Sequence, residues 1–201
     1  GIMHYFLKQV LYRQANGIIV QTELARIITE QTLRHKNIIK IANPVRRITP
    51  SDIPKENIIL NVGRFIDLKQ QRLLLEIFSS IDVQGWKLVF AGDGPDLKAV
   101  QKYADNLQLI NEVVFLGDTR DIDEYYRKSE IFAFTSKSEG FPNALAEALQ
   151  VPLAAISFDC TAGPSDLIED GFNGFLISLN DLEDYRVKLK LLMLDPDLRN
   201  E

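Results

Sequence analysis

Cysteine and histidine are scarce in this 201-residue chain, which has one cysteine and two histidines. The single cysteine, Cys160, excludes an intrachain disulfide and favours a reducing compartment. Because His4 and His35 lie far from Cys160 in the sequence, no base is predicted to activate its thiol as a nucleophile. No cluster of His, Cys and Asp residues stands out, so the sequence predicts no metal site.

The chain also lacks a basic excess and a long apolar run. Its formal net charge of -5 argues against a nucleic-acid-binding surface. No stretch approaches the roughly 20 apolar residues that cross a bilayer. The apolar N-terminus is interrupted by Lys8 and matches a signal peptide poorly, because it has no small-residue cleavage site. The hydrophobic share of 46% is ordinary for a globular protein, and we expect a cytoplasmic location.

From Asn57 onward, short apolar runs alternate with amphipathic segments. One such segment places Leu74, Phe78 and Ile81 at i, i+4 and i+7, on one face of a helix. Strict alternation of strand and helix predicts βαβ units, and therefore a parallel sheet covered on both faces. The predicted fold class is α/β, with a Rossmann-like, doubly wound domain over residues 51–201. The predicted strands are Ile58 to Val62, Lys87 to Ala91, Val113 to Leu116, Ile131 to Phe134, Leu153 to Phe158 and Phe175 to Ile177.

The first fifty residues have a different organisation. Two helices (about Tyr5 to Gln14 and Glu23 to Arg34) and two strands (Gly17 to Val20 and Ile38 to Ile41) are expected, which are too few to close a sheet. Asn43-Pro44 and the residues that follow it are typical of a turn-rich linker. We therefore predict that residues 1–50 are the tail of a preceding domain plus a linker, and that the sequence is cut at both ends.

The loop after the first strand of the predicted domain carries Gly63, Arg64 and Lys69. A glycine lets the backbone approach a ligand closely, and two cations near one strand end match the charge of a phosphate. Taken alone, this loop is better interpreted as a solvated turn with two ordinary surface charges.

Two further strand-end loops have structural interpretations. The loop Gly92 to Pro95 begins like a dinucleotide-binding fingerprint, but Leu97 stands where the third glycine of G-x-G-x-x-G belongs. We therefore predict a structural turn there, with Pro95 in the first turn of the next helix. After the next strand, Asp121 is expected to cap a helix through its side chain.

The segment from Glu139 to Glu147 is the most informative part of the chain. Pro142 has the fixed backbone angle of a helix start, and the next three amides, of residues 143–145, would face an anion with the helix dipole behind them. The helix is expected to run to about Gln150. Carboxylates beside an anion site suit the hydroxyl groups of a ribose or a sugar. Taken alone, two glutamates at this spacing are more often ordinary surface residues.

The order of the loops is more specific than any one of them. The relevant segments are Val62-Gly63-Arg64 with Lys69, Ala91 to Pro95, Phe115 to Gly117, Ser136 to Glu147, and Gly163 to Ser165 with Asp170 to Gly174. In this order the sequence resembles the C-terminal domain of group 1 (family 4) retaining glycosyltransferases, from about Asn43 to the chain end. Its most specific element is the pair Glu139 and Glu147, which matches the family's E-x7-E motif. Residues 15–22 and 41–45 look like the closing segments of the family's N-terminal domain.

The resemblance implies the C-terminal half of a GT-B architecture, in which the active site lies between two Rossmann-like domains. It implies retaining transfer of a hexose-type sugar, without a metal or other cofactor, from a nucleotide diphosphate donor to a glycan or lipid-linked acceptor. A UDP-sugar is favoured over a GDP-sugar by family frequency alone. Many relatives dock on membranes, so the resemblance also implies peripheral contact with the inner face of a membrane through the N-terminal domain.

The resemblance also implies roles for individual residues. Arg64 and Lys69 would neutralise the donor diphosphate and Glu139 would contact the transferred sugar, which makes these three the candidate catalytic residues. Glu147 would accept from the ribose hydroxyls, and the stretch from Thr119 to Asp121 would lie beside the nucleobase. The complete set of expected donor-binding residues is Gly63, Thr119, Asp121, Gly140, Phe141, Asn143, Ala144, Leu145 and Glu147.

Two positions depart from the family pattern. Pro152 stands where a helix-ending glycine is usual, and Ala154 stands where a proline is usual. Because proline also stops a helix, we expect the turn to be kept. We expect the isolated chain to bind a nucleotide with little or no sugar transfer. The alternatives are a non-catalytic nucleotide-binding or scaffold domain and a nicotinamide-dependent oxidoreductase, against which the missing third glycine weighs.

Overall fold

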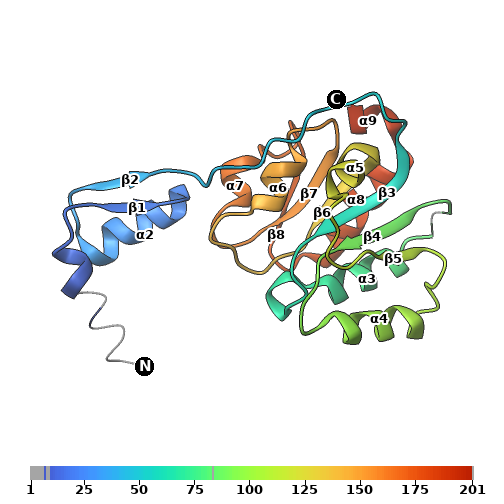
Figure 1. Cartoon of the computed structure of the whole chain (residues 1–201), viewed down its shortest axis with the longest axis horizontal. Helices are drawn as coiled ribbons and strands as arrows, with labels where there is room; N and C mark the ends of the chain where they lie inside the picture. The colour runs from blue at the N-terminus through green and yellow to red at the C-terminus, as the bar shows by residue number, and fades with distance from the viewer. Residues whose placement is uncertain (1–6, 8–9, 83, 201) are drawn as a thin grey trace.

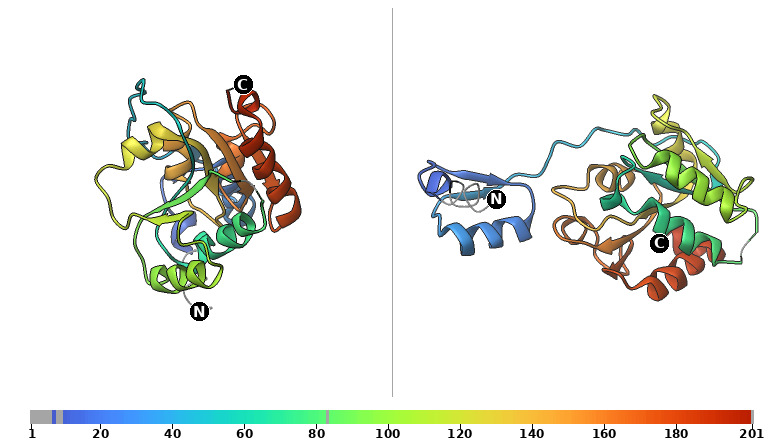
Figure 2. Two further views of the ribbon diagram at one scale, coloured as in Figure 1. Left: turned by 90° about the vertical axis from the view of Figure 1, so that its right-hand side faces the viewer. Right: turned by 90° about the horizontal axis from the view of Figure 1, so that it is seen from below.

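The computed structural model describes residue 7, residues 10–82 and residues 84–200. A small N-terminal unit is joined by an extended linker to a larger α/β unit, as Figures 1 and 2 show. The small unit contains β1 (Ile18–Val20), α2 (Glu23–Leu33) and β2 (Ile38–Lys40), and its two strands pair in parallel. The helix expected before β1 begins outside the described residues, although residues 10–13 are helical. The predicted assignment of residues 1–50 to a preceding domain stays a prediction.

The larger unit is built on a six-stranded sheet in which every pair of neighbouring strands is parallel. The strand order is β5-β4-β3-β6-β7-β8, so the chain starts in the middle, builds one half, and then returns to build the other half. This is the doubly wound order of a Rossmann-like fold, and it confirms the predicted fold class. The strands are β3 (Glu56–Val62), β4 (Lys87–Ala91), β5 (Val113–Phe115), β6 (Ser129–Phe134), β7 (Ala154–Asp159) and β8 (Phe175–Ser178).

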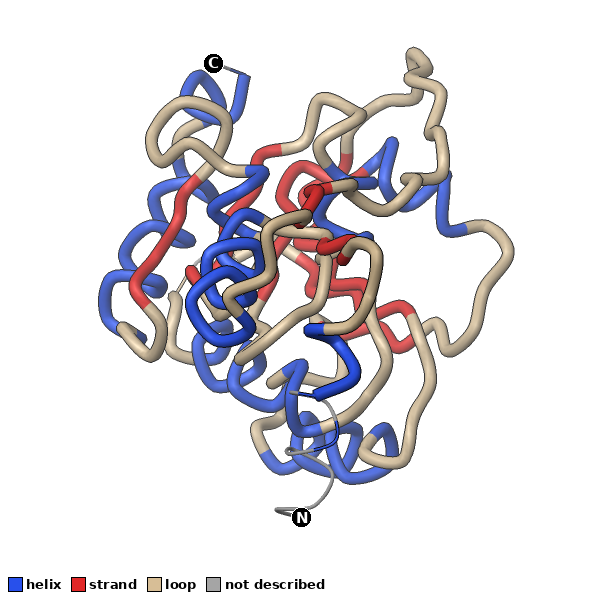
Figure 3. The backbone as a smooth tube through the Cα atoms, turned by 90° about the vertical axis from the view of Figure 1, so that its left-hand side faces the viewer, coloured by secondary structure: helices blue, strands red, loops and turns tan. Residues whose placement is uncertain are grey.

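Helices cover both faces of this sheet, and the strands lie between them (Figure 3). The core on one face is closed by α3 (Gln71–Ser79), α4 (Leu97–Asn106) and α8 (Leu182–Leu194). The core on the other face is closed by α5 (Ile122–Lys128), α6 (Asn143–Ala148) and α7 (Pro164–Leu167). The short elements η1 (Asp67–Lys69) and α9 (Pro196–Asn200) complete the unit.

The central strand β3 explains why these strands are apolar throughout. Ile59 packs into one core, whereas its neighbours Ile58 and Leu60 pack into the other. All three side chains are buried because successive residues of a strand point to opposite faces, and here each face is covered by helices. No helix within the described ranges has the length and hydropathy needed to span a membrane.

Two predictions about helix starts were wrong. Pro95 is not in the first turn of α4, because that helix begins at Leu97 with Asp96 as its N-cap. Asp121 does take the N-cap position of α5, but its side chain makes no capping hydrogen bond. The Asp121 amide itself donates to the Thr119 hydroxyl at 3.1 Å. The turn at Pro152 is kept, since α6 ends at Ala148 and β7 begins at Ala154.

Candidate functional site

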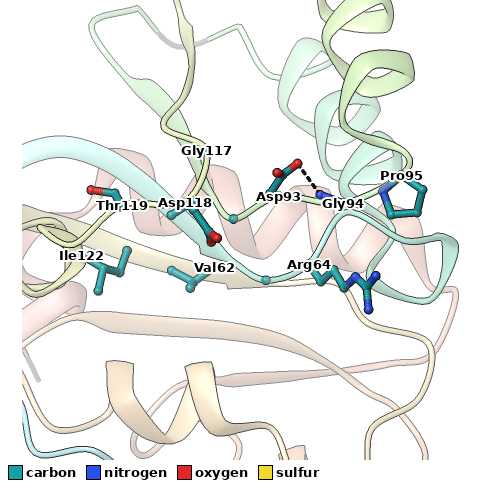
Figure 4. A pocket seen from close by; sticks show the side chains of 12 residues that line it. Val62, Arg64, Asp93, Gly94, Pro95, Gly117, Asp118, Thr119 and Ile122 are labelled. Carbon is teal, nitrogen blue, oxygen red and sulfur yellow. Dashed lines mark hydrogen bonds between the residues drawn. The ribbon is translucent and has the colours of Figure 1, made fainter.

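A cavity of about 670 Å³ opens at the carboxyl ends of β3, β4 and β5. It lies beside the switch point of the sheet, where β3 and β6 are neighbours and the direction of winding reverses. Figure 4 shows Arg64 and Pro95 at one end of the cavity and Thr119 and Ile122 at the other. Its lining residues are Val62, Gly63, Arg64, Ala91, Gly92, Asp93, Gly94, Pro95, Gly117, Asp118, Thr119 and Ile122.

Glycines bring the loops that line this cavity close together. A Cβ atom on Gly92 would lie 2.2 Å from the Gly63 carbonyl oxygen, and one on Gly94 would lie 2.3 Å from the Phe65 carbonyl oxygen. Both separations are far below van der Waals contact, so neither position accepts a side chain without a backbone shift. The Phe65 amide also donates to the Asp93 carbonyl oxygen at 2.9 Å. The loop Gly92 to Pro95 is therefore packed tightly against the loop after β3 and forms one wall of the cavity, and its interpretation as a structural turn stays a prediction.

Arg64 follows β3 and lines the cavity, and its guanidinium makes no ion pair with any described residue. Its backbone is held in place, because the Gln71 side-chain amide donates to the Arg64 carbonyl oxygen at 3.1 Å. The cation therefore has a fixed base and uncommitted donors, which suits it to bind an anion.

Lys69 and Glu139 form an ion pair beside the cavity. The Lys69 Nζ atom lies 2.5 Å from Glu139 Oε1, and the two side chains are 22% and 10% exposed, respectively. The stem of Lys69 lies over Gly63, since a Cβ atom on that glycine would be 3.6 Å from the Lys69 Cδ atom. The Thr135 hydroxyl donates to the Lys69 carbonyl oxygen at 3.0 Å. The structure thus brings three predicted site residues, Gly63, Lys69 and Glu139, to one place.

Cys160 is buried near this ion pair. Burial, together with the negative charge of Glu139, raises the pKa of its thiol to about 11. The thiol is therefore protonated at neutral pH, which agrees with the expectation that Cys160 is not a nucleophile.

Glu147 lies in α6 and contacts two side chains that were not predicted. Its Oε2 atom accepts a hydrogen bond from the Tyr126 hydroxyl at 3.1 Å and lies 3.4 Å from Arg46 Nη2. Burial raises the pKa of Tyr126, and the negative charge of Glu147 adds to this, so the phenol stays protonated as a donor. Arg46 comes from the linker and also pairs with Asp123 of α5.

The start of α6 differs from the expected row of free amides. The Asn143 amide donates to the Phe141 carbonyl oxygen at 3.0 Å, so it is not free to meet an anion. This part of the prediction was wrong, because Pro142 takes the N-cap position with a backbone conformation that turns the Asn143 amide back on the loop. Ala144 and Leu145 follow it in the first turn, where amides have no helical partner. The Leu145 and Phe141 side chains are buried, so only their backbones are available to a ligand.

The remaining predicted residues occupy different places around the site. Thr119 lines the cavity, whereas Asp121 is not among its lining residues. Gly140 lies in the loop before α6, where a Cβ atom would be 3.6 Å from the Gln21 side chain of the small unit. Sequence reasoning missed Arg46 and Tyr126. Arg46 stands in a linker with no recognisable pattern, and Tyr126 follows Ile122 by four residues on a helix, which is the spacing of an ordinary core residue.

No group of three or more His, Cys, Asp and Glu side chains within the described ranges is arranged to hold a metal ion. Arg64 lines the cavity at the strand ends, and the Lys69–Glu139 ion pair lies beside it. A cavity at the strand ends of a doubly wound sheet is the arrangement of a Rossmann-like ligand-binding unit. Residues 47–201 match the model of the family described as glycosyl transferases group 1, and the chain belongs to this family.

Comparisons with known proteins agree with this assignment. The chain is 32% identical to the amylovoran biosynthesis glycosyltransferase AmsD of Erwinia amylovora, over 96% of this chain and 57% of that protein. It is 26% identical to the lipopolysaccharide 1,6-galactosyltransferase of Salmonella typhimurium, over 84% of this chain and 49% of that protein. The chain therefore spans about half the length of the curated relatives it matches.

Solved structures match the fold over nearly the whole chain. A crystal structure of a TarM mutant from S. aureus, in complex with fondaparinux, alpha-GlcNAc-glycerol and UDP, superimposes with a TM-score of 0.87. The sequence identity is 26%, and the match covers 94% of this chain and 39% of that chain. The predicted resemblance to the C-terminal domain of the group 1 glycosyltransferases is confirmed.

Proposed function

We propose that this chain is the donor-binding portion of a retaining, metal-independent glycosyltransferase. The donor would be a nucleotide diphosphate hexose, with a UDP-sugar favoured over a GDP-sugar, and the acceptor a glycan or glycolipid. The observation that carries this proposal is the cavity at the strand ends, with Arg64 unpaired among the described residues at one end and the Lys69–Glu139 ion pair beside it.

The similar proteins support the choice of donor and acceptor. The TarM structure contains UDP, which makes UDP the first nucleotide to test here. The relative from Salmonella typhimurium is named for lipopolysaccharide and the relative from Erwinia amylovora for amylovoran, which supports a glycolipid or polysaccharide acceptor. We also propose a cytoplasmic location, at the inner face of the membrane where lipid-linked acceptors are reached.

The chemistry of the proposed reaction needs positive charge at the leaving group. When the bond between sugar and diphosphate breaks, negative charge develops on the diphosphate, and fixed cations stabilise it most where water is excluded. Arg64 has uncommitted donors, and the Lys69 ammonium is already fixed on a mostly buried carboxylate. A diphosphate bound in the cavity would share Lys69 with Glu139 and leave the second Glu139 oxygen to the transferred sugar.

Glu139 and Glu147 are donor-positioning residues in this proposal rather than a general acid and base. Each carboxylate is already engaged by a cation, Glu139 by Lys69 and Glu147 by Arg46. An ion-paired carboxylate remains an acceptor for hydroxyl groups, because it has lone pairs to spare. Because this chain spans about half the length of the curated relatives it matches, we expect it alone to bind donor nucleotides with little or no transfer.

Titration calorimetry with UDP, GDP and NAD⁺ tests the proposal. We expect UDP to bind most tightly, and we expect Arg64→Ala to weaken UDP binding by about tenfold or more, as the loss of a charge-assisted hydrogen bond does. Lys98→Ala removes an exposed cation from α4 and is the matched control, with an expected change of less than about twofold. Absence of binding by UDP and GDP, or equal binding by the Arg64→Ala variant, would refute the proposal.

A further inference from the structure

Glu147 is engaged on only one of its two carboxylate oxygens. The Tyr126 hydroxyl and Arg46 Nη2 both approach Oε2, at 3.1 and 3.4 Å. No described residue makes a hydrogen bond to Oε1. Rotation about the last bond of a glutamate side chain is broad and nearly two-fold, so two partners on the same oxygen select one orientation of the group. The other oxygen is thereby left as a fixed acceptor.

Arg46 is placed by a second set of contacts, because it comes from the linker and not from the sheet unit. The Gln150 side-chain amide donates to the Arg46 carbonyl oxygen at 2.8 Å, and its oxygen accepts from the Ile48 amide at 3.2 Å. The Ile48 side chain is 1% exposed and packs into the core that contains α5 and α6. The Gln150 side chain, just after α6, therefore holds the linker at the residues on both sides of Arg47.

The Arg46 guanidinium connects carboxylates from two helices. It pairs with Asp123 of α5 and with Glu147 of α6, and its side chain is 45% exposed. A planar guanidinium has donors in a fixed fork and can bind two acceptors in a defined geometry, unlike the point charge of a lysine. Tyr126 also lies 3.2 Å from the Ala144 carbonyl oxygen, which ties the phenol to the first turn of α6.

We propose that Arg46, held on the protein surface by Gln150, is a positioning residue for donor binding. With Tyr126 it fixes Oε2 of Glu147, so that Oε1 accepts hydrogen bonds from the ribose hydroxyls of the donor nucleotide. This inference rests on the proposed function and adds a residue that the nucleotide does not touch. An acceptor that is oriented before the ligand arrives loses less conformational freedom on binding, which raises affinity. Donor binding is thereby linked to the position of the linker.

The test compares two ligands that differ only at the ribose: UDP and its 2′,3′-dideoxy analogue. The affinity ratio of the two reports the ribose contact, and a general loss of folded protein does not change it. In Arg46→Met we expect this preference for UDP to fall by about threefold, as expected for a half-exposed ion pair. Arg47→Met is the matched control, because it removes the same charge from an exposed arginine that forms no ion pair among the described residues.

Two further variants separate the possible outcomes. In a Glu147→Ala background, Arg46→Met should have no additional effect on the ratio, because the two residues act through one contact. Gln150→Ala should also reduce the preference for UDP, because it leaves the Arg46 side chain in place but removes the contact that positions it. If the unmodified chain prefers UDP and Arg46→Met keeps the full preference, this inference is wrong and the proposed function stands. If the unmodified chain binds neither UDP nor GDP, the proposed function is wrong and the inference fails with it.

Discussion

Replacement of Gly92 by alanine is a demanding test of how the cavity is built. Gly92 has a φ of +130°, and a Cβ atom there would lie 2.2 Å from the Gly63 carbonyl oxygen. The surrounding backbone has little freedom to move, because it is held by two hydrogen bonds. The Gly63 amide donates to the Ala91 carbonyl oxygen and the Gly92 amide donates to the Gly117 carbonyl oxygen, each at 2.9 Å. Overpacking costs about 1–3 kcal/mol and a strained backbone conformation a further 1–3 kcal/mol.

We therefore expect Gly92→Ala to lower the free energy of unfolding by about 3 kcal/mol, which corresponds to a fall in Tm of roughly 6–12 °C for a chain of this size. Gly117→Ala is the control, because Gly117 also has a positive φ (+64°) but a Cβ atom there meets nothing within 4 Å. The left-handed conformation alone costs about 1–2 kcal/mol, so this variant should lower Tm by about 2–8 °C, less than Gly92→Ala. Thermal unfolding followed by circular dichroism measures both. Equal shifts in the two variants would show that the contact between the loops is not as tight as the structure indicates.

Two other predictions concern the buried thiol of Cys160 and the contacts of Arg199. Because burial raises the pKa of Cys160 to about 11, iodoacetamide should alkylate the folded protein slowly at pH 8 and faster as the pH rises toward that value; rapid labelling at pH 8 would contradict this account. Arg199 donates hydrogen bonds to the Glu130 carboxylate and the Leu192 carbonyl oxygen, so Arg199→Ala should lower the free energy of unfolding by about 2 kcal/mol. Because the guanidinium also lies over the indole ring of Trp86, the single tryptophan, the variant should alter the fluorescence of the protein. Arg186→Ala removes an exposed pair with Glu183 and should change that energy by less than about 0.5 kcal/mol; an equal effect of the two variants would refute the distinction.

The strands of the larger unit could be predicted from the sequence because each of them is buried on both faces. The run Lys87 to Ala91 was predicted with the bounds that the structure shows, and the predicted run Ile58 to Val62 differs from β3 by two residues at its start. The sequence predicted a doubly wound fold class, but it did not predict which strand lies next to which. Helix starts were less predictable, because a proline or an aspartate near a helix suits several positions. Pro95 and Asp121 show this, since each lies one turn or less from the role it was given.

The candidate site was predictable where residues follow a strand and unpredictable where they arrive from elsewhere. Gly63 and Arg64 line the cavity and Lys69 meets Glu139, because parallel strands bring their carboxyl ends to one edge of the sheet. Arg46 reaches Glu147 across 101 positions of sequence, through a linker whose path depends on Gln150 and Ile48. No local pattern encodes a contact of that kind. The predicted roles of the individual site residues toward a nucleotide stay predictions.

We propose that the strand-end cavity and the adjacent ion pair bind a nucleotide diphosphate. A crystal structure of this chain grown with UDP and GDP offered together tests it most directly. We expect electron density for the nucleotide within the cavity, with the base near Thr119, the diphosphate within hydrogen-bond distance of Arg64 and Lys69, and the ribose beside Glu147. Nucleotide density at another surface, for instance the pocket between α3 and α4, would contradict it.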